Sequence, residues 1–272
     1  IEGQKVIKVF CHEEEAIEDF KKHNEELRKA LAEVFKDKKI YESSNLLCIP
    51  AFDIITATPR VFKRDYKKFT EDNKKTYVDV ALATSAAPTY LPIHNLESSQ
   101  YVDGGVWANN PSLVGLMEFL YQFANDERFN GVDILSISSL EVAQGNAPKR
   151  NYNSFIDWNE NLIELFSIGQ AKNMTKLFEF LDGKLKFPMN YVRITNEPLS
   201  AEHMRNISMD NASDRSLKIL QSIGNATAIK AKIGKKFAEA IPAAIPLAVV
   251  LVFVDEKCLL QAVQGGRDLL DE

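Results

Sequence analysis

One aspartate occupies a place in the sequence where chemistry is often found. Asp103 ends a short stretch, 100–103, that has the character of a strand, and Gly104 and Gly105 follow it directly. Two glycines permit a sharp turn, so the carboxylate would project from the carboxyl edge of the strand, where α/β sheets place their sites. Asp-Gly is also among the commonest turn dipeptides. The segment alone therefore leaves two interpretations, a catalytic carboxylate and an ordinary turn residue.

Strands and helices alternate on both sides of this aspartate. Hydrophobic periodicity and apolar runs predict them in this order: a helix at 13–35, strands at 46–52 and 59–63, a helix at 77–87, a strand at 100–103, a helix opening at Asn110-Pro111, a strand at 132–138, helical segments at 155–181, a strand at 190–195 and a helix at 213–240. The first helix is expected to break near His23. This order favours an α/β layered fold with a largely parallel sheet.

The motifs around Asp103 resemble a known family. Residues 83–92 read ATSAAPTYLP, residues 109–112 read NNPS, and residues 49–62 hold IPAFD followed by P-x-x-F. The order ATSAAP, P, DGG, NNP resembles the C-terminal half of patatin-like phospholipases. The resemblance rests on specific motifs over about 25–120, and on element order alone as far as about residue 238.

This resemblance implies acyl transfer by a serine and an aspartate. In the family a serine in a G-x-S-x-G turn attacks the ester carbonyl, the aspartate accepts its proton, and backbone N–H groups of a glycine-rich loop stabilise the oxyanion. Carried onto this chain, the resemblance makes Asp103 the catalytic carboxylate, partly desolvated and close to the hydroxyl. Asp103 is the only residue to which a chemical role is carried over. The resemblance implies no metal and no organic cofactor.

The serine part of the pattern is missing from this sequence. None of the 12 glycines forms a G-x-S-x-G, and no glycine cluster suits an oxyanion loop. Ser85 lies in a stretch to which the resemblance assigns helix packing, and the serines within 136–139 have no flanking glycines. The chain starts at Ile1 rather than at a methionine, so we expect a piece of a longer enzyme. A degenerate relative that hydrolyses nothing is the alternative.

Other residue types give no support to metal chemistry. The histidines form no pair at i,i+4 and no H-E-x-x-H, and His94 is interpreted as a surface loop residue, with an approach to Asp103 as the alternative. The 3 cysteines are far apart and odd in number, which predicts neither a disulfide framework nor a zinc knuckle and favours a reducing compartment.

Composition and charge narrow the classes of function. The chain has 272 residues, 45% hydrophobic and 26% charged, which is typical of a globular protein. A net charge of -5 gives no positive field to hold a nucleic-acid backbone, so no nucleic-acid partner is expected. Residues 63–75 mix basic and aromatic side chains, as a segment facing anionic lipid headgroups would, but acidic residues interrupt them. A solvated loop is therefore favoured.

A long uncharged segment lies near the C-terminal end of the sequence. Residues 240–254 are shorter than the roughly 20 residues that cross a bilayer as a helix, and Pro242 and Pro246 would interrupt such a helix. A buried strand or packed segment is favoured, and a membrane-touching segment is the alternative.

These observations together predict a three-layer α/β fold of the patatin type with a mainly parallel central sheet. Whether this fold is truncated on its N-terminal side is left open. Residues 1–239 are expected to be the C-terminal part of an acyl hydrolase domain, and 240–272 an apolar extension. The predicted function is hydrolysis of phospholipids or related ester lipids by a Ser–Asp dyad to which this chain contributes Asp103. The alternative is an inactive scaffold acting in storage or protein interaction. We expect a cytoplasmic location, with peripheral membrane association as an addition, and no oligomeric state is assigned.

Overall fold

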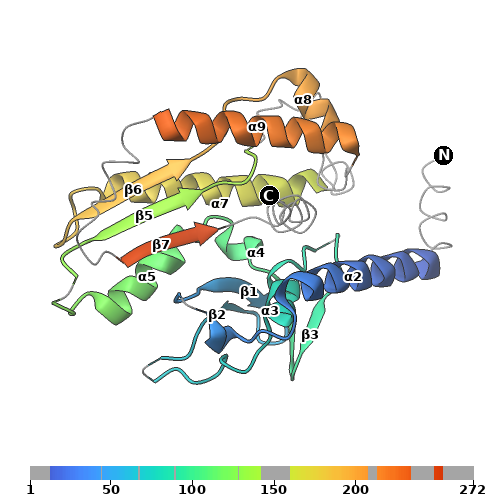
Figure 1. The fold of residues 1–272 in the computed structure, drawn as a ribbon, viewed down its shortest axis with the longest axis horizontal. Coiled ribbons are helices and arrows are strands. Elements are labelled where there is room, and N and C mark those ends of the chain that lie inside the picture. The colour runs from blue at the N-terminus through green and yellow to red at the C-terminus, as the bar shows by residue number, and fades with distance from the viewer. Residues whose placement is uncertain are drawn as a thin grey trace. The chain divides into compact units, whose positions relative to one another are not determined.

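The computed structural model describes residues 13–43, 45–66, 68–88, 90–127, 129–141, 160–207, 213–233 and 248–253. These residues form two compact units that divide between Val106 and Trp107. Each unit has its own sheet (Figure 1). Each unit also has its own buried hydrophobic cluster. The chain is therefore an α/β protein, as the sequence predicted.

The first unit contains a four-stranded sheet in the order β2-β1-β4-β3, with all neighbours antiparallel. Its strands are β1 (Ile49–Asp53), β2 (Thr58–Phe62), β3 (His94–Leu96) and β4 (Ser99–Asp103). Short turns join β1 to β2 and β3 to β4, and connections of that length can only join antiparallel strands. The prediction of a largely parallel sheet is therefore wrong for this unit.

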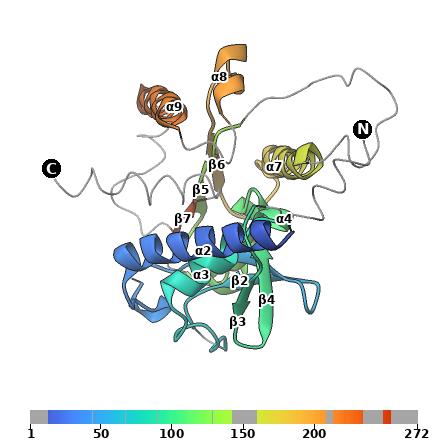
Figure 2. The same cartoon turned by 90° about the vertical axis from the view of Figure 1, so that its right-hand side faces the viewer.

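Two helices stack on one side of this sheet, α2 (Glu13–Phe35) and α3 (Tyr77–Thr84). α3 contacts the sheet and α2 contacts α3 (Figure 2). α2 continues through His23, where a break was expected, because no glycine or proline interrupts it. α3 ends before the predicted position, since the proline at 88 disfavours helical backbone in the residue before it.

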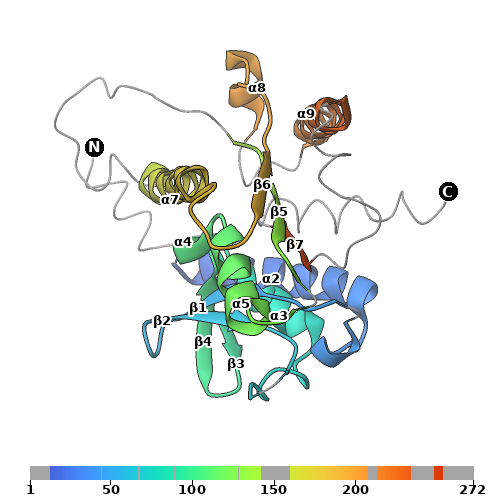
Figure 3. The same ribbon diagram turned by 90° about the vertical axis from the view of Figure 1, so that its left-hand side faces the viewer.

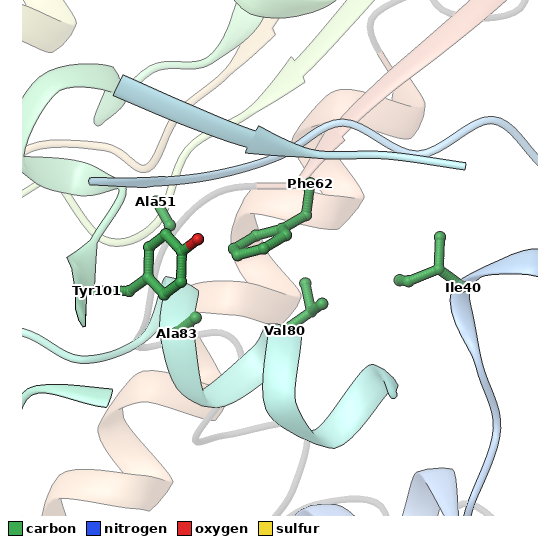
Figure 4. Packing of buried hydrophobic residues seen from close by; sticks show 6 residues of the cluster. All are labelled: Ile40, Ala51, Phe62, Val80, Ala83 and Tyr101. Atoms are coloured by element: carbon green, nitrogen blue, oxygen red, sulfur yellow. The ribbon is translucent and has the colours of Figure 1, made fainter. Parts of the chain in front are cut away.

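The core of the first unit lies between α3 and the sheet. Figure 4 shows its buried residues, which are Ile40, Ala51, Phe62, Val80, Ala83 and Tyr101. The rings of Phe62 and Tyr101 meet edge to face with their centroids 5.1 Å apart, a favourable arrangement of aromatic quadrupoles. Ile40 belongs to the short 3-10 helix η1 (Ile40–Glu42) and is fully buried. It therefore anchors the segment between α2 and β1 to this core.

The second unit contains a three-stranded sheet in the order β6-β5-β7, and here both pairs are parallel. Its strands are β5 (Val132–Ile137), β6 (Met189–Ile194) and β7 (Ala248–Phe253). The prediction of parallel pairing is confirmed for this unit. Within it, Figure 3 shows helices on both sides of the sheet, with α7 (Glu160–Leu181) on one side and α9 (Asp214–Ile233) on the other.

The remaining helices are short or amphipathic. They are α4 (Gly105–Ala108), which crosses the division between the units, α5 (Ser112–Phe123) and α8 (Ala201–Asn206). α5 and α7 pack on the parallel sheet through a cluster that includes Leu116, Phe119, Ile134 and Phe178. The rings of Phe178 and Tyr191 stack with centroids 4.3 Å apart, which joins α7 to β6.

β7 lies inside the segment that was expected to be an apolar extension. Its residues pair with β5 from Val132↔Ala248 to Ile137↔Phe253, so the strand interpretation is confirmed for 248–253. The domain boundary at 239/240 stays a prediction. The predicted helix residues 155–159 and 234–240 lie outside the described residues. Within the described ranges, no helix combines the length and apolar character needed to cross a membrane.

Candidate functional site

Asp103 is the last residue of β4, where the sequence placed it. It lies opposite Ala51 of β1, and its side chain is half-buried. Its backbone N–H donates to the carbonyl of Ala86 at 3.0 Å, and its Oδ1 accepts a hydrogen bond from the backbone N–H of Gly105 at 2.6 Å. A charge-assisted bond of this length fixes the direction of a carboxylate. Asp103 is thus held by its own turn and by the segment after α3.

Gly104 is required for a reason that the sequence did not reveal. An ideal Cβ added to Gly104 would lie 2.3 Å from the carbonyl oxygen of Pro50 and 2.5 Å from its carbonyl carbon. Among the described glycines only Gly183 has a positive φ, so neither Gly104 nor Gly105 needs left-handed backbone. The turn after Asp103 therefore uses a glycine because its backbone passes directly against β1.

The ATSAAP segment, residues 83–88, holds this turn in place through hydrogen bonds. The hydroxyl of Thr84 donates to the carbonyl of Pro50 at 2.6 Å, and the carbonyl of Thr84 accepts from Gly104 at 3.4 Å. Ser85 is buried and its hydroxyl donates to Ala81 at 2.8 Å, which agrees with the packing role expected of it. Sequence reasoning missed Thr84. Its only local signal is a hydroxyl side chain in the last turn of an otherwise apolar helix.

The NNPS segment belongs to the second unit and begins a buried polar network. The Oδ1 of Asn110 accepts from the backbone N–H of Ser112 at 3.2 Å and from its hydroxyl at 2.6 Å, while the Nδ2 of Asn110 donates to Tyr191 at 3.3 Å. The N-cap of α5 is Pro111 rather than Asn110. The helix thus begins one residue later than expected, and Asn110 supplies a capping hydrogen bond from the position before the N-cap.

The serine of β5 that the sequence singled out is part of the same network. Ser136 is buried, and its hydroxyl accepts from the NH1 group of Arg193 at 2.8 Å. Arg193 also donates to Glu141 at 2.8 Å. The hydroxyl of Ser136 also donates to the Oδ1 of Asn110 at 3.4 Å, and neither an amide nor a guanidinium is a base that could remove its proton. Ser136 is therefore a structural residue.

His94 is not a surface loop residue. It lies on β3 opposite Tyr101 and is 6% exposed, with its Nε2 3.8 Å from the Oδ1 of Asp79. Burial lowers the pKa of His94, and the carboxylate of Asp79 offsets part of that effect. The sequence interpretation failed because the strand that follows Pro92 has only 3 residues, too few to give an alternating pattern.

The described residues contain no group of three or more His, Cys, Asp or Glu side chains that could hold a metal ion. Asp103 is the one sequence-selected residue that lies half-buried at a strand end with its carboxylate fixed by a backbone donor. Its catalytic role stays a prediction.

Comparison with known proteins identifies the family. The family model for patatin-like phospholipase matches residues 17–115, which include Asp103 and its hydrogen-bond partners Ala86 and Gly105. A protein named cGAMP-activated phospholipase from Vibrio cholerae serotype O1 is 30% identical over 213 residues, covering 73% of this chain and 59% of that protein. This chain belongs to the patatin-like phospholipase family.

Other members match over a similar part of their length. A cGAMP-activated phospholipase of Escherichia coli strain TW11681 is 31% identical over 196 residues, covering 65% of this chain and 52% of that protein. Patatin-like protein 2 of Arabidopsis thaliana is 27% identical over 215 residues, covering 70% of this chain and 52% of that protein. The chain thus spans about half the length of the curated patatin-like relatives it matches.

Proposed function

We propose that this chain contributes the aspartate of a patatin-like lipid acyl hydrolase, in which Asp103 accepts the proton of a nucleophilic serine. The observation that carries the proposal is the fixed, half-buried carboxylate of Asp103 at the end of β4, within the part of the chain that matches the family. The substrate class is a phospholipid or a related ester lipid, as the names of the relatives suggest.

The proposed reaction is a two-step acyl transfer. The serine oxygen attacks the ester carbonyl while its proton passes to Asp103, and the tetrahedral intermediate expels the alcohol, which takes that proton. Water then attacks the acyl-enzyme, giving its proton to Asp103, and the released serine recovers a proton as the fatty acid leaves. One short hydrogen bond from Gly105 orients the carboxylate, and rigid orientation is what a general base requires.

This sequence holds no G-x-S-x-G, so the proposal assigns the serine to a part of the enzyme that the sequence does not contain. The three-layer arrangement of the family belongs to this proposal as well. A cytoplasmic location with peripheral contact to membranes completes it. Activation by cGAMP is part of the names of the bacterial relatives and concerns those proteins.

The test uses the full-length product of the gene and a fluorogenic phospholipid. Asp103→Asn keeps the shape of the side chain and an oxygen that can accept from Gly105, but it removes the base. We expect turnover to fall by about a hundred- to ten-thousand-fold. Asp182→Asn, at an exposed aspartate outside the first unit, is the matched control and should keep full turnover. Full turnover by the Asp103→Asn enzyme would reject the proposal.

A second candidate function is an inactive patatin-like scaffold acting in storage or protein interaction. It is favoured by the missing G-x-S-x-G motif. A fluorophosphonate probe separates the two candidates, because it reacts only with an activated serine. Labelling of the full-length protein supports the hydrolase. No labelling, together with no hydrolysis of ester lipids, supports the scaffold.

A further inference from the structure

Two segments of the first unit that are distant in sequence lie side by side. Residues 36–43 follow α2, and residues 63–77 lead from β2 into α3. Three backbone hydrogen bonds join them, from Ile40 to Lys75 at 3.0 Å, from Tyr41 to Asn73 at 3.3 Å and from Tyr77 to Lys38 at 2.9 Å. These two segments therefore form one continuous piece of surface.

This surface carries many basic side chains. We call them the basic strip, which consists of Lys36, Lys38, Lys39, Arg64, Lys68 and Lys74. All are exposed except Arg64, which is half-buried and donates from NH1 to the carbonyl of Ser43 at 2.9 Å. That bond ties the start of the second segment to the end of the first. Within the described ranges, no carboxylate forms an ion pair with any member of the strip.

Two of the three acidic residues that interrupt the basic run in the sequence, Asp65 and Asp72, are turned inward. Asp72 is fully buried and binds the guanidinium of Arg60 at 2.6 Å and the backbone N–H of Lys63 at 3.1 Å. Asp65 is half-buried and accepts from the backbone N–H groups of Asp72 at 2.7 Å and Asn73 at 3.1 Å. These carboxylates therefore hold the loop together instead of neutralising its outer face.

The exposed acids of these two segments are fewer than the cations of the basic strip, so the surface keeps a net positive charge. Glu71 lies 3.4 Å from Arg60, and the carboxylate of Glu42 accepts from the backbone N–H of Lys39 at 2.6 Å. Asp37 is the remaining exposed acid within these two segments. The chain as a whole has a net charge of -5, so the basic strip is a local exception to its charge.

Exposed apolar side chains lie beside these cations. Ile40 is buried in the core shown in Figure 4, so its neighbours Lys39 and Tyr41 face outward, and Tyr41 is 50% exposed. Leu46, a few residues further, is 48% exposed. Tyrosine beside lysine is the combination found where proteins meet the headgroup region of a membrane. A partner with negative charge but no apolar layer, such as a nucleic acid, would make no apolar contact with Tyr41 and Leu46.

We propose that the basic strip binds the surface of an anionic lipid bilayer, with Tyr41 and Leu46 reaching the headgroup layer. The proposal rests on the proposed lipid hydrolase function, since it names where the enzyme would meet its substrate surface. Each Lys or Arg near such a surface strengthens binding by about fivefold. The sequence favoured a solvated loop for 63–75, and the inward direction of Asp65 and Asp72 reverses that preference.

The test measures co-sedimentation of the purified chain with vesicles. Vesicles of phosphatidylcholine alone are compared with vesicles that contain about one third phosphatidylglycerol, at low and at high salt. We expect binding only to the anionic vesicles and a steep loss with salt. The triple variant Lys38→Glu, Lys39→Glu and Lys74→Glu should lose binding by about a hundredfold or more. Its control reverses three exposed lysines elsewhere, Lys22, Lys29 and Lys172.

The outcomes separate this proposal from the proposed function. Binding needs no hydrolysis, so vesicle binding by a chain that never hydrolyses lipid keeps this proposal and counts only against the enzyme. Equal binding by the triple variant and the wild type, with unchanged circular dichroism, overturns it. A wild type that does not bind anionic vesicles overturns the proposal as well. Strip-dependent capture of a single-stranded oligonucleotide in place of vesicles would assign the surface to nucleic acid and also overturn it.

Discussion

At Gly104 the backbone that follows Asp103 passes closer to Pro50 than any side chain permits. The clash of an added Cβ would be with backbone atoms of β1, which cannot rotate away as a flexible side chain can. The position of the Asp103 carboxylate thus depends on the absence of one methyl group on the next residue.

Gly104→Ala is expected to lower the free energy of unfolding by about 1–3 kcal/mol or more, because β1 and the turn must move apart. Urea denaturation measures this change. Gly169→Ala and Gly224→Ala are matched controls in α7 and α9, where an added Cβ meets nothing within 4 Å, and they should be neutral or stabilising by up to about 1 kcal/mol. A Gly104→Ala protein as stable as the controls would contradict this account of the turn.

His94 makes the first unit sensitive to acid. Burial holds its pKa below the ordinary value of 6.5, with Asp79 raising it in part and Arg28 lowering it further. The folded protein therefore binds fewer protons at this site than the unfolded chain does below pH 6.5. The free energy of unfolding therefore has its full value above that pH, where His94 is neutral, and decreases as the pH falls below it.

His94→Gln keeps a polar side chain of similar reach but cannot be protonated. We expect the wild type to lose more stability than this variant between about pH 7.5 and about pH 5.5, since only the wild type must release a proton to fold. Denaturant midpoints at several pH values, at constant ionic strength, measure the difference. Parallel curves for the two proteins would show that His94 does not titrate in this way.

At the scale of the elements, the loop between β2 and α3 contains a buried carboxylate, Asp72, whose shorter ion pair is with Arg60. Asp72 is 0% exposed and its carboxylate lies 2.6 Å from the NH2 group of Arg60, whose side chain is 20% exposed. The guanidinium of Arg60 also lies over the rings of Phe62 and Phe69, 5.0 and 5.7 Å from their centroids. The loop therefore has a defined shape although its surface is highly charged.

Asp72→Asn should destabilise the protein by about 3–5 kcal/mol, because it leaves the largely buried Arg60 without its main counter-charge. Glu71→Gln is the natural control, since Glu71 meets the same guanidinium at 3.4 Å but is 68% exposed, and its loss should change stability by less than about 1 kcal/mol. Thermal and urea unfolding of both variants provide the measurement. Equal effects of the two substitutions would disprove the distinction between the buried and the exposed pair.

At the scale of the whole molecule, the sheets of the two units differ in how far apart in sequence their paired strands lie. The antiparallel unit is built from neighbouring hairpins, whereas the parallel unit joins β5, β6 and β7 across long connections. β5 lies between the other two strands, so both of its edges are paired in the described structure. The last of these strands lies close to the C-terminal end of the printed sequence.

A chain ending at residue 247 would lack β7 and leave β5 as an edge strand with unpaired N–H and C=O groups. We expect a lower unfolding temperature and aggregation on gel filtration compared with a chain ending at residue 253, which keeps the whole β5–β7 ladder. If both truncated chains behave alike, then β7 does not contribute to this sheet, and the predicted domain ending at residue 239 would gain support.

The sequence alone determined the features that depend on neighbouring residues. It placed Asp103 at the end of a strand, located β1, β2, β5 and β6, and pointed to the family through motifs around DGG. Periodicity, turn residues and short motifs are local properties of the chain, so they can be recognised without a fold. The mechanism of Asp103 belongs to the same resemblance and awaits the turnover test.

The tertiary structure decided what depends on residues far apart in the sequence. Strand direction in the first unit, the contact of Gly104 with Pro50, the burial of His94 beside Asp79 and the inward direction of Asp72 all arise from such contacts. The two residues of each side-chain contact are 12 or more positions apart, so no single helix, strand or turn contains both of them. A side chain's burial and charge balance are set by the partner that folding brings to it, and for that reason only the folded chain shows which carboxylates are used internally and which cations stay exposed.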